Sequence, residues 1–147
     1  MNAHQSKINS VLSAIGFQSL NPLQEETLEK SVTSKNVLIL SQTGSGKTFA
    51  FLLPLFLNLD PEAKHIQALV LAPSRELALQ IEDVWRSMKT NFKVLSCYGG
   101  HSISTEKKSL TEAPALLIGT PGRICDHISR QTIDLSKATQ LVVDEYD

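Results

Sequence analysis

The sequence predicts a doubly wound α/β fold, in which a parallel β-sheet is buried under helices on both faces. Two observations support this prediction. Short runs that are apolar throughout, as expected for strands covered on both faces, alternate with stretches of helical periodicity. The predicted strands are Asn36–Ser41, Gln67–Ala72, Lys93–Cys97, Ala115–Gly119 and Gln140–Asp144. The predicted helices are Lys7–Ile15, Pro22–Ser31, Lys47–Asn58, Ser74–Lys89 and Pro121–Ser129.

The first two predicted helices precede the first predicted strand. In the first helix, the apolar side chains share one stripe, formed by Ile8, Val11, Leu12 and Ile15. In the second, Asn21 is the expected N-cap, because Pro22 fits the first helical position and Gln24 completes a capping box. Trp85 is expected in the core, because it belongs to the apolar stripe of Ser74–Lys89.

Length and composition describe an ordinary globular domain. The 147 residues correspond to one domain, and 41% hydrophobic with 20% charged residues excludes a disordered or collagen-like chain. The net charge of −1 excludes a polybasic protein whose partner shows in the total charge. A net charge near zero is still compatible with a local groove lined by basic side chains.

The two cysteines, Cys97 and Cys125, form no C-x-x-C pair, and the histidines do not cluster with them in sequence. A structural zinc site or a redox dithiol is therefore not expected, and two reduced thiols are favoured over one disulfide. The N-terminus lacks the features of a secretory signal, and the longest apolar stretch is too short to span a membrane. These observations predict a cytoplasmic protein without a membrane partner.

The segment Ser41–Thr48, SQTGSGKT, follows the first predicted strand and leads into a predicted helix. This is the context of a phosphate-binding loop: Gly44 and Gly46 let backbone N–H groups turn inward, and the helix N-terminus adds further donors. Lys47 is expected to reach the β- and γ-phosphates of a nucleotide, and the Thr48 hydroxyl to ligate Mg²⁺. The first glycine of the general pattern is a serine here. The alternative is a glycine-rich turn beside an exposed lysine.

The last predicted strand ends in Asp144 and Glu145. In parallel sheets, ligands bind at the carboxyl ends of the strands. Asp144 is therefore expected to hold the metal ion, directly or through water, and Glu145 to orient or polarise a water for attack on the γ-phosphate. Strands that end in acidic residues are common, so this prediction depends on the phosphate loop belonging to the same sheet.

Six segments, in this order, resemble the motifs of the N-terminal RecA-like domain of DEAD-box ATP-dependent RNA helicases. They are Gly16-Phe17 with Pro22-Leu23-Gln24 (the Q motif), Ser41–Thr48 (motif I), Pro73–Gln80 (motif Ia), Gly99-Gly100 (the GG doublet), Thr120–Arg123 (motif Ib) and Asp144–Asp147, where the family has D-E-A-D. The resemblance implies a RecA-like P-loop NTPase fold, a three-layer α/β sandwich with a mainly parallel sheet. It also implies ATP and Mg²⁺ as cofactors and RNA as the partner.

The resemblance implies roles for individual residues. Phe17 would pack on adenine and Gln24 would read it, because one amide group can both accept from N6 and donate to N7. The nucleotide phosphates would be held by Gln42, Thr43, Gly44, Ser45, Gly46, Lys47 and Thr48. The catalytic residues would be Lys47, Asp144 and Glu145, with Mg²⁺ held by Thr48 and Asp144. For Phe17, a place in the core is the alternative to a base contact.

RNA would be bound by Arg75, Gly100, Thr120, Gly122 and Arg123. Backbone N–H groups, a hydroxyl and two guanidinium groups suit sequence-independent phosphate contacts, and the glycines let the RNA backbone approach closely. The alternatives are an ion pair of Arg75 with a neighbouring carboxylate such as Glu76 or Glu82, and ordinary capping at the start of a helix for Thr120 and Gly122. Lys107 and Lys108 match a solvated helix face better than an RNA site.

The expected domain organisation follows from the same resemblance. Residues 1–35 would form N-terminal helices with the Q motif, and residues 36–147 the first RecA-like domain, incomplete at its C-terminus. A second RecA-like domain, which supplies arginine fingers in cis, would be missing, so the chain alone is expected to hydrolyse little ATP and to unwind nothing. Tyr146 replaces the alanine of D-E-A-D, and Leu20-Asn21 stand where the family usually has Pro-Thr.

Three other functions stay open as alternatives. A DNA helicase or translocase with the same core is disfavoured by the Q motif and by the PSRELA sequence. A non-catalytic nucleotide-binding module is disfavoured because Lys47, Thr48, Asp144 and Glu145 are all present. A P-loop kinase gives no reason for Gln24 or for the TPGR sequence.

Overall fold

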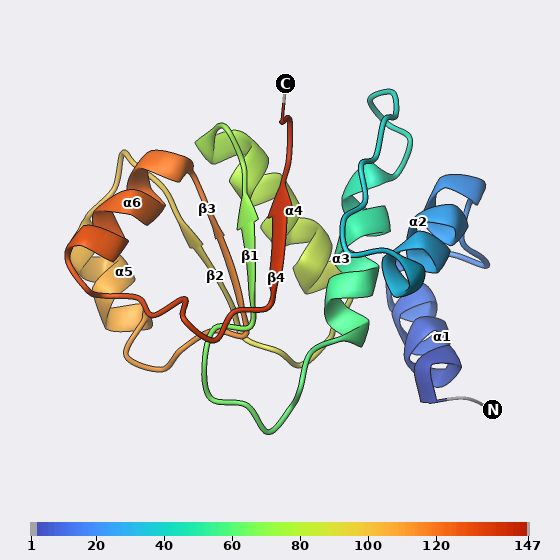
Figure 1. Ribbon diagram of the computed structural model, residues 1–147, viewed down its shortest axis with the longest axis horizontal. Helices are drawn as coiled ribbons and strands as arrows, with labels where there is room; N and C mark the ends of the chain where they lie inside the picture. Colours follow the sequence, from blue (N-terminus) through green and yellow to red (C-terminus); the bar gives the residue numbers. More distant parts are fainter. Residues whose placement is uncertain (1–2, 147) are drawn as a thin grey trace. The chain divides into compact units, whose positions relative to one another are not determined.

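The computed structural model describes residues 3–146, which divide into two compact units (Figure 1). The first unit comprises the residues up to 58 together with 84–90, and the second comprises 59–83 and the residues from 91 onward. Helices α1 (Ala3–Ile15), α2 (Pro22–Thr33) and α3 (Lys47–Leu57) belong to the first unit. Helix α4 (Arg75–Ser87) begins in the second unit and ends in the first. All four strands belong to the second unit.

The first unit is built around α3, which is apolar on all sides and buried from Phe49 to Leu57. A helix of this kind needs other helices around it. Helix α1 contributes its apolar stripe, with Ile8, Val11 and Leu12 buried. Trp85 is almost fully buried, and its ring meets that of Phe56 edge-to-face at a centroid distance of 6.3 Å. The predicted place of this tryptophan in the core is confirmed.

The second unit contains a four-stranded parallel sheet in the order β2-β3-β1-β4. The strands are β1 (Ala68–Leu71), β2 (Val94–Cys97), β3 (Leu116–Gly119) and β4 (Gln140–Val143). In register, Leu71 lies opposite both Gly119 and Val143, and Cys97 lies opposite Gly119. The carboxyl ends of the four strands therefore meet at one edge of the sheet.

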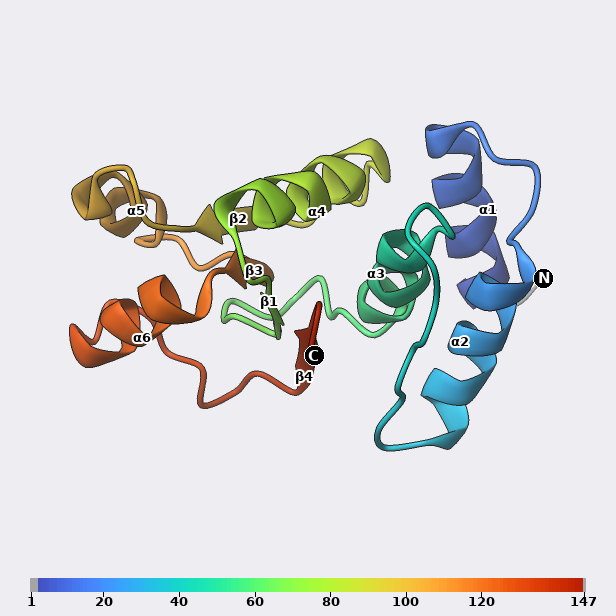
Figure 2. The ribbon, with the colours of Figure 1, turned by 90° about the horizontal axis from the view of Figure 1, so that it is seen from above.

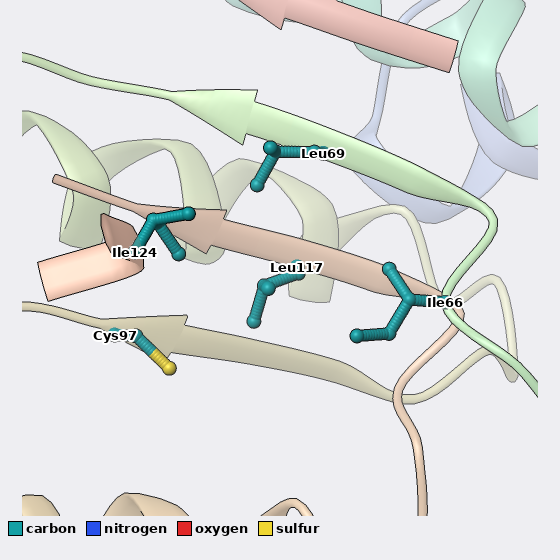
Figure 3. Close-up of a cluster of buried hydrophobic side chains, with 5 residues drawn as sticks. All are labelled: Ile66, Leu69, Cys97, Leu117 and Ile124. Atoms are coloured by element: carbon teal, nitrogen blue, oxygen red, sulfur yellow. The ribbon is translucent and has the colours of Figure 1, made fainter. Parts of the chain in front are cut away.

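Helices cover both faces of this sheet. The first part of α4 and helix α6 (Pro121–Ser129) lie on opposite sides of the central strands (Figure 2). On the α6 side, Ile124 packs against strand side chains in a cluster of Ile66, Leu69, Cys97, Leu117 and Ile124 (Figure 3). On β1 and β3 the side chains are buried on both faces, which explains why these strands are apolar throughout rather than alternating.

One predicted strand is wrong: Asn36–Ser41 forms neither a helix nor a strand. Leu38 and Leu40 are 74% and 83% exposed, and Val37 is exposed as well. A parallel strand exists only when a neighbour satisfies its backbone groups, and this segment pairs with none of the described strands. An apolar run of this length is therefore insufficient evidence for a strand.

Other predicted elements differ from the observed ones by one to four residues at their ends, the largest difference being at the start of α1, and α6 has the predicted bounds. Helix α5 (Ile103–Ser109) carries Lys107 and Lys108, the predicted solvated face, and Lys108 is exposed. The predicted domain boundary after residue 35 stays a prediction. No helix among residues 3–146 is long and apolar enough to cross a membrane.

Candidate nucleotide site and nucleic-acid interface

The phosphate loop, residues 41–48, has the backbone geometry that its glycines predict. Gly44 and Gly46 have φ angles of 82° and 84°, in the left-handed region that favours glycine. Gly46 is the N-cap of α3, so the first-turn N–H groups of that helix have no intrahelical partner and point out of its N-terminus. A Cβ atom on Gly46 would lie 2.6 Å from Nε2 of Gln24 and 3.1 Å from Nδ2 of Asn21. The loop therefore requires glycine at this position on two grounds.

The N-terminus of α2 is tied to this loop by two side-chain amides. Asn21 and Gln24 form the predicted capping box, in which Oδ1 of Asn21 accepts from the Gln24 N–H at 3.0 Å and Oε1 of Gln24 accepts from the Asn21 N–H at 2.9 Å. The same side chains donate to the loop: Asn21 to the carbonyl of Ser45 at 3.0 Å, and Gln24 to that of Gly46 at 3.4 Å. This second role of the two amides is not apparent from the sequence. A glutamine amide has two N–H donors and two lone pairs, so Gln24 retains capacity for a base.

Phe17 follows α1 and is 49% exposed, so it is not a core residue. Its ring contacts that of Phe49 edge-to-face at a centroid distance of 6.0 Å. The Phe17 ring therefore packs against the apolar helix α3, while about half of the residue faces solvent. This arrangement is compatible with the predicted adenine contact.

Polar atoms without partners lie in and beside the phosphate loop. The hydroxyl groups of Ser41 and Ser45 are buried, and neither has a hydrogen-bond partner among the described residues. Lys47 and Thr48 are half-buried in the first turn of α3. The donor set of backbone N–H groups, hydroxyls and one ammonium fits a triphosphate, and the Thr48 hydroxyl is of the oxygen type that Mg²⁺ prefers. Gln42 and Thr43, also assigned to the nucleotide by resemblance, are exposed.

In the second unit, four predicted segments follow the carboxyl ends of the four strands and so lie at the same edge of the sheet. Arg75 is exposed at the start of α4, and its Cζ lies 5.0 Å from the ring centroid of Tyr98. Gly100 has a φ of 89°, and a Cβ atom there would lie 3.5 Å from Nη1 of Arg75. The Arg75 side chain therefore packs against the loop that carries the GG doublet.

Arg123, at the start of α6, also contacts the loop of the GG doublet. Its Nε donates to the carbonyl of Tyr98 at 3.1 Å and its Nη2 to that of His101 at 2.8 Å, one residue on either side of Gly99-Gly100. Thr120 is the N-cap of α6, but its hydroxyl makes no capping hydrogen bond. A Cβ atom on Gly122 would meet nothing within 4 Å. The surface at Thr120 and Gly122 is therefore open to an approaching ligand.

The acidic strand end places Asp144 directly after β4, where it is buried. The N–H of Asp144 donates to the carbonyl of Leu71 at 2.9 Å, which continues the pairing of β4 with β1, and Oδ1 accepts from the Glu145 N–H at 3.0 Å. Glu145 has a φ of 55°, a strained value for a residue with a side chain. Tyr146 is exposed, and Asp147 lies outside the described residues. The phosphate loop belongs to the other unit, so the meeting of the two sites stays a prediction.

A buried polar cluster beneath the loop of the GG doublet was not expected from the sequence. Glu106 of α5 is 2% exposed, and donors surround its carboxylate. Oε2 accepts from the Tyr98 N–H at 3.0 Å and from Nε2 of His101, while Oε1 lies 2.6 Å from Nε2 of the fully buried His127 and 3.6 Å from Nε of Arg123. These residues come from separate segments of the chain, so no local sequence pattern indicates the cluster.

Cys97 also borders this cluster, and both cysteines are free. Burial, with further contributions from the charge of Glu106 and a hydrogen bond to it, raises the pKa of the Cys97 thiol from 9.0 to about 12. The reactive form of cysteine is the thiolate. Cys97 therefore remains predominantly a neutral, unreactive thiol in the folded protein at pH values well below 12.

The native protein is accordingly expected to expose one reactive thiol, that of Cys125. Titration with an aromatic disulfide reagent at pH 8 should release one equivalent rapidly and the second only after unfolding. Because burial raises the pKa of Cys97, its thiolate stays a minor species at pH 9.5 as well, and its labelling in the folded protein should remain far slower than that of Cys125. Rapid labelling of both thiols in the folded protein would contradict this assignment, and a Cys125→Ser variant provides the control.

A glycine-rich loop at the start of a helix, and a parallel sheet whose strands are followed by acidic and basic residues, are features of α/β proteins of the phosphate-loop class. The chain belongs to the DEAD/DEAH box helicase family, whose model matches residues 21–147. The predicted membership of this family is thereby confirmed.

Related proteins match the chain almost throughout. It is 42% identical over 146 residues to the ATP-dependent RNA helicase DeaD of Escherichia coli, which covers 97% of this chain and 23% of that protein. It is 40% identical over 144 residues to the DEAD-box ATP-dependent RNA helicase CshA of Bacillus subtilis, covering 97% of this chain and 29% of that protein. The chain thus spans about a quarter of the length of these relatives.

A solved structure has the same fold. The crystal structure of a hypothetical ATP-dependent RNA helicase from Sulfolobus tokodaii superimposes with a TM-score of 0.82 at 30% sequence identity, covering 97% of this chain and 41% of that one. The RecA-like α/β fold predicted from the resemblance is confirmed, together with the parallel arrangement of its sheet.

Proposed function

We propose that this chain is the ATP- and RNA-binding N-terminal portion of a DEAD-box RNA helicase, which couples ATP hydrolysis to the unwinding of RNA duplexes in a longer protein. The observation that carries the proposal is the gathering of Arg75, the GG doublet, Thr120–Arg123 and Asp144 at one sheet edge in a member of the helicase family. The family supplies the reaction class, and the edge supplies the surface on which RNA would lie.

In the first unit, the nucleotide would be held by the phosphate loop, with Phe17 and Gln24 at the adenine. The φ angles of Gly44 and Gly46 and the partnerless hydroxyl of Ser45 support this assignment. Lys47 would neutralise phosphate charge, and the Thr48 hydroxyl with Asp144 would hold Mg²⁺. When bound, Mg²⁺ supplies charge neutralisation at the phosphates. Glu145 would hold the attacking water in the orientation for hydrolysis.

In the second unit, RNA would lie across Arg75, Gly100, Thr120, Gly122 and Arg123. The contacts would go to phosphates, because the guanidinium groups, the Thr120 hydroxyl, which makes no capping hydrogen bond, and the open Gly122 carry no base-reading pattern. A second RecA-like domain in cis would complete the RNA groove and supply arginine fingers, so this chain alone should bind without appreciable unwinding. The free thiols support a reducing, cytoplasmic setting.

Binding to single strands tests this proposal against its alternatives. Fluorescence anisotropy would compare labelled oligouridine with oligodeoxythymidine of the same length, with and without Mg²⁺ and a non-hydrolysable ATP analogue. Tighter binding to RNA, strengthened by the nucleotide, is expected. Equal or tighter binding to DNA would instead identify a DNA translocase core. Thermal unfolding with and without nucleotide is the second measurement, and the absence of any shift would identify a non-catalytic module that does not use ATP.

Substitution of Gly122 by alanine separates RNA binding from stability. Gly122 is in the first turn of α6 with open space around it, so the added methyl group should leave stability unchanged or raise it by up to about 1 kcal/mol. If the RNA backbone lies against this glycine, however, the methyl group should weaken oligouridine binding roughly tenfold. Thermal unfolding and anisotropy measure the two effects, and unchanged RNA affinity would remove Gly122 from the interface.

A further inference from the structure

The buried carboxylate of Glu106 is linked to Arg75 through a stack of side chains. Nε2 of His101 contacts Oε2 of Glu106, and the ring of His101 stacks on that of Tyr98 with a centroid distance of 4.3 Å and an interplanar angle of 10°. The guanidinium of Arg75 lies over Tyr98, 5.0 Å from the ring centroid. Glu106 fixes one end of this stack, and the exposed Arg75 forms the other.

A second link joins Glu106 to Arg123. Nε of Arg123 lies 3.6 Å from Oε1 of Glu106 while it donates to the carbonyl of Tyr98, and Nη2 donates to that of His101. Glu106 also receives the N–H of Tyr98 directly. The loop from Tyr98 to His101 is therefore held at both ends by groups that meet at a single carboxylate.

The partners of Glu106 explain why its charge can be buried. A buried charge is tolerated when donors or an opposite charge compensate it. Here the carboxylate faces a main-chain N–H, two imidazole nitrogens and a guanidinium, and the Cys97 thiol also hydrogen-bonds to it. Thr132 contacts the other ring nitrogen of His127 at 2.6 Å, which fixes the orientation of that ring.

The same side chains include metal-ligand types, since ligand atoms of Cys97, Glu106 and His127 lie within 4.8 Å of one another. Two observations argue against a cation there. The guanidinium of Arg123, at 3.6 Å from Oε1, would repel it, and both carboxylate oxygens already accept from protein donors. The cluster is therefore complete as a hydrogen-bonded anchor.

We propose that Glu106 is a positioning residue for RNA binding, which holds the loop Tyr98–His101 and orients Arg75 and Arg123 toward the RNA backbone. The inference rests on the proposed RNA-binding function and names the residue that organises its surface. Glu106 itself is buried and touches no RNA; it acts through the His101–Tyr98 stack and through Arg123.

The test compares two substitutions that remove the same charge from the second unit. Glu106→Gln keeps the shape of the buried side chain, whereas Glu112→Gln changes an exposed carboxylate. By Coulomb attraction alone, losing a negative charge strengthens binding to a polyanion. Loss of positioning does the opposite. Oligouridine binding is expected to weaken roughly tenfold in Glu106→Gln and to stay equal or become slightly tighter in Glu112→Gln.

Binding should be measured on the full chain at a temperature where circular dichroism shows each variant to be folded, so that lost stability does not appear as lost affinity. The salt dependence of binding should also become shallower in Glu106→Gln, by about one phosphate contact for each misoriented arginine. Affinity of Glu106→Gln equal to or tighter than that of Glu112→Gln would overturn the proposal. If Glu106→Gln does not fold, His101→Ala breaks the same stack at a partly exposed position and should weaken RNA binding without affecting ATP binding.

Amide hydrogen exchange separates this inference from the proposed function. The Tyr98 N–H donates to Glu106, so its exchange should be faster in Glu106→Gln than in Glu112→Gln. If the unmodified chain binds no oligouridine, the RNA-binding function fails, and faster exchange would still support the anchoring of the loop. Equal exchange in the two variants would overturn the positioning role whatever the RNA result.

Discussion

Substitution of Lys47 by alanine should strongly reduce the stabilisation of this chain by ATP. Lys47 begins α3 directly after Gly46 and is the ammonium group of the phosphate loop. A hydrogen bond to a charged group contributes about 1.5–3 kcal/mol, so loss of this lysine should weaken ATP binding by roughly 10- to 100-fold. At ATP concentrations near 100 times the wild-type Kd, the stabilisation would fall from about 2.7 kcal/mol to about 1.4 kcal/mol for a 10-fold loss of affinity and to about 0.4 kcal/mol for a 100-fold loss.

Thermal unfolding with and without Mg²⁺ and ATP measures this effect directly. Lys35→Ala is the matched control, because Lys35 is an exposed lysine of the same unit outside the loop. That variant should keep the full shift, while both variants should unfold at similar temperatures without nucleotide. An undiminished ATP shift in Lys47→Ala would remove this lysine from the nucleotide site.

The second large effect is expected from Gly119→Ala in the core of the second unit. Gly119 ends β3, opposite Leu71 and Cys97. An added Cβ atom would clash with Cδ1 of Ile124, and would lie 2.6 Å from Cγ1 of Ile124 and 2.9 Å from the carbonyl oxygen of Cys97. The carbonyl belongs to a paired strand and has no room to move. Overpacking of this kind should lower the free energy of unfolding by about 2–3 kcal/mol.

Gly99→Ala provides the comparison, since its Cβ atom would meet nothing within 4 Å and its φ lies outside the left-handed region. Its stability should stay within about 0.5 kcal/mol of the wild type. Urea unfolding of both variants measures the difference. Equal stability of the two would mean that α6 can move away from β3, which the packing of Ile124 in its buried cluster argues against.

Features set by neighbouring residues were predictable from the sequence. The capping box at Asn21 and Gln24 and the bounds of α6 were confirmed, because caps and a proline at the first helical turn act within one turn of the chain. The left-handed Gly44 and Gly46 belong to the same group. The conformation of the glycine-rich loop and the start of α2 and α6 were therefore predictable without a structure.

Features that depend on distant partners were not predictable. The segment Asn36–Ser41 has the composition of a strand, but strand formation requires a neighbour that composition does not specify. The cluster around Glu106 joins residues from the loop after β2, from α5 and from α6, so each of them in isolation matches an ordinary charged or polar position. Arg123 was expected to face RNA, and its hydrogen bonds to the carbonyls of Tyr98 and His101 emerged only from the fold.

The exposed segment from Val37 to Leu40 has a consequence for the behaviour of this chain in solution. It is a short stretch of high β-propensity without charge, proline or glycine, and its leucines face solvent. Such a segment can pair with the same segment of another copy of the chain as β-strands. Stacking of copies then buries the apolar side chains that are exposed in a single copy. Concentrated preparations are therefore expected to self-associate through this segment. Leu38→Lys or Leu40→Lys should reduce this association, because natural proteins use lysine on exposed edge strands to prevent pairing between copies.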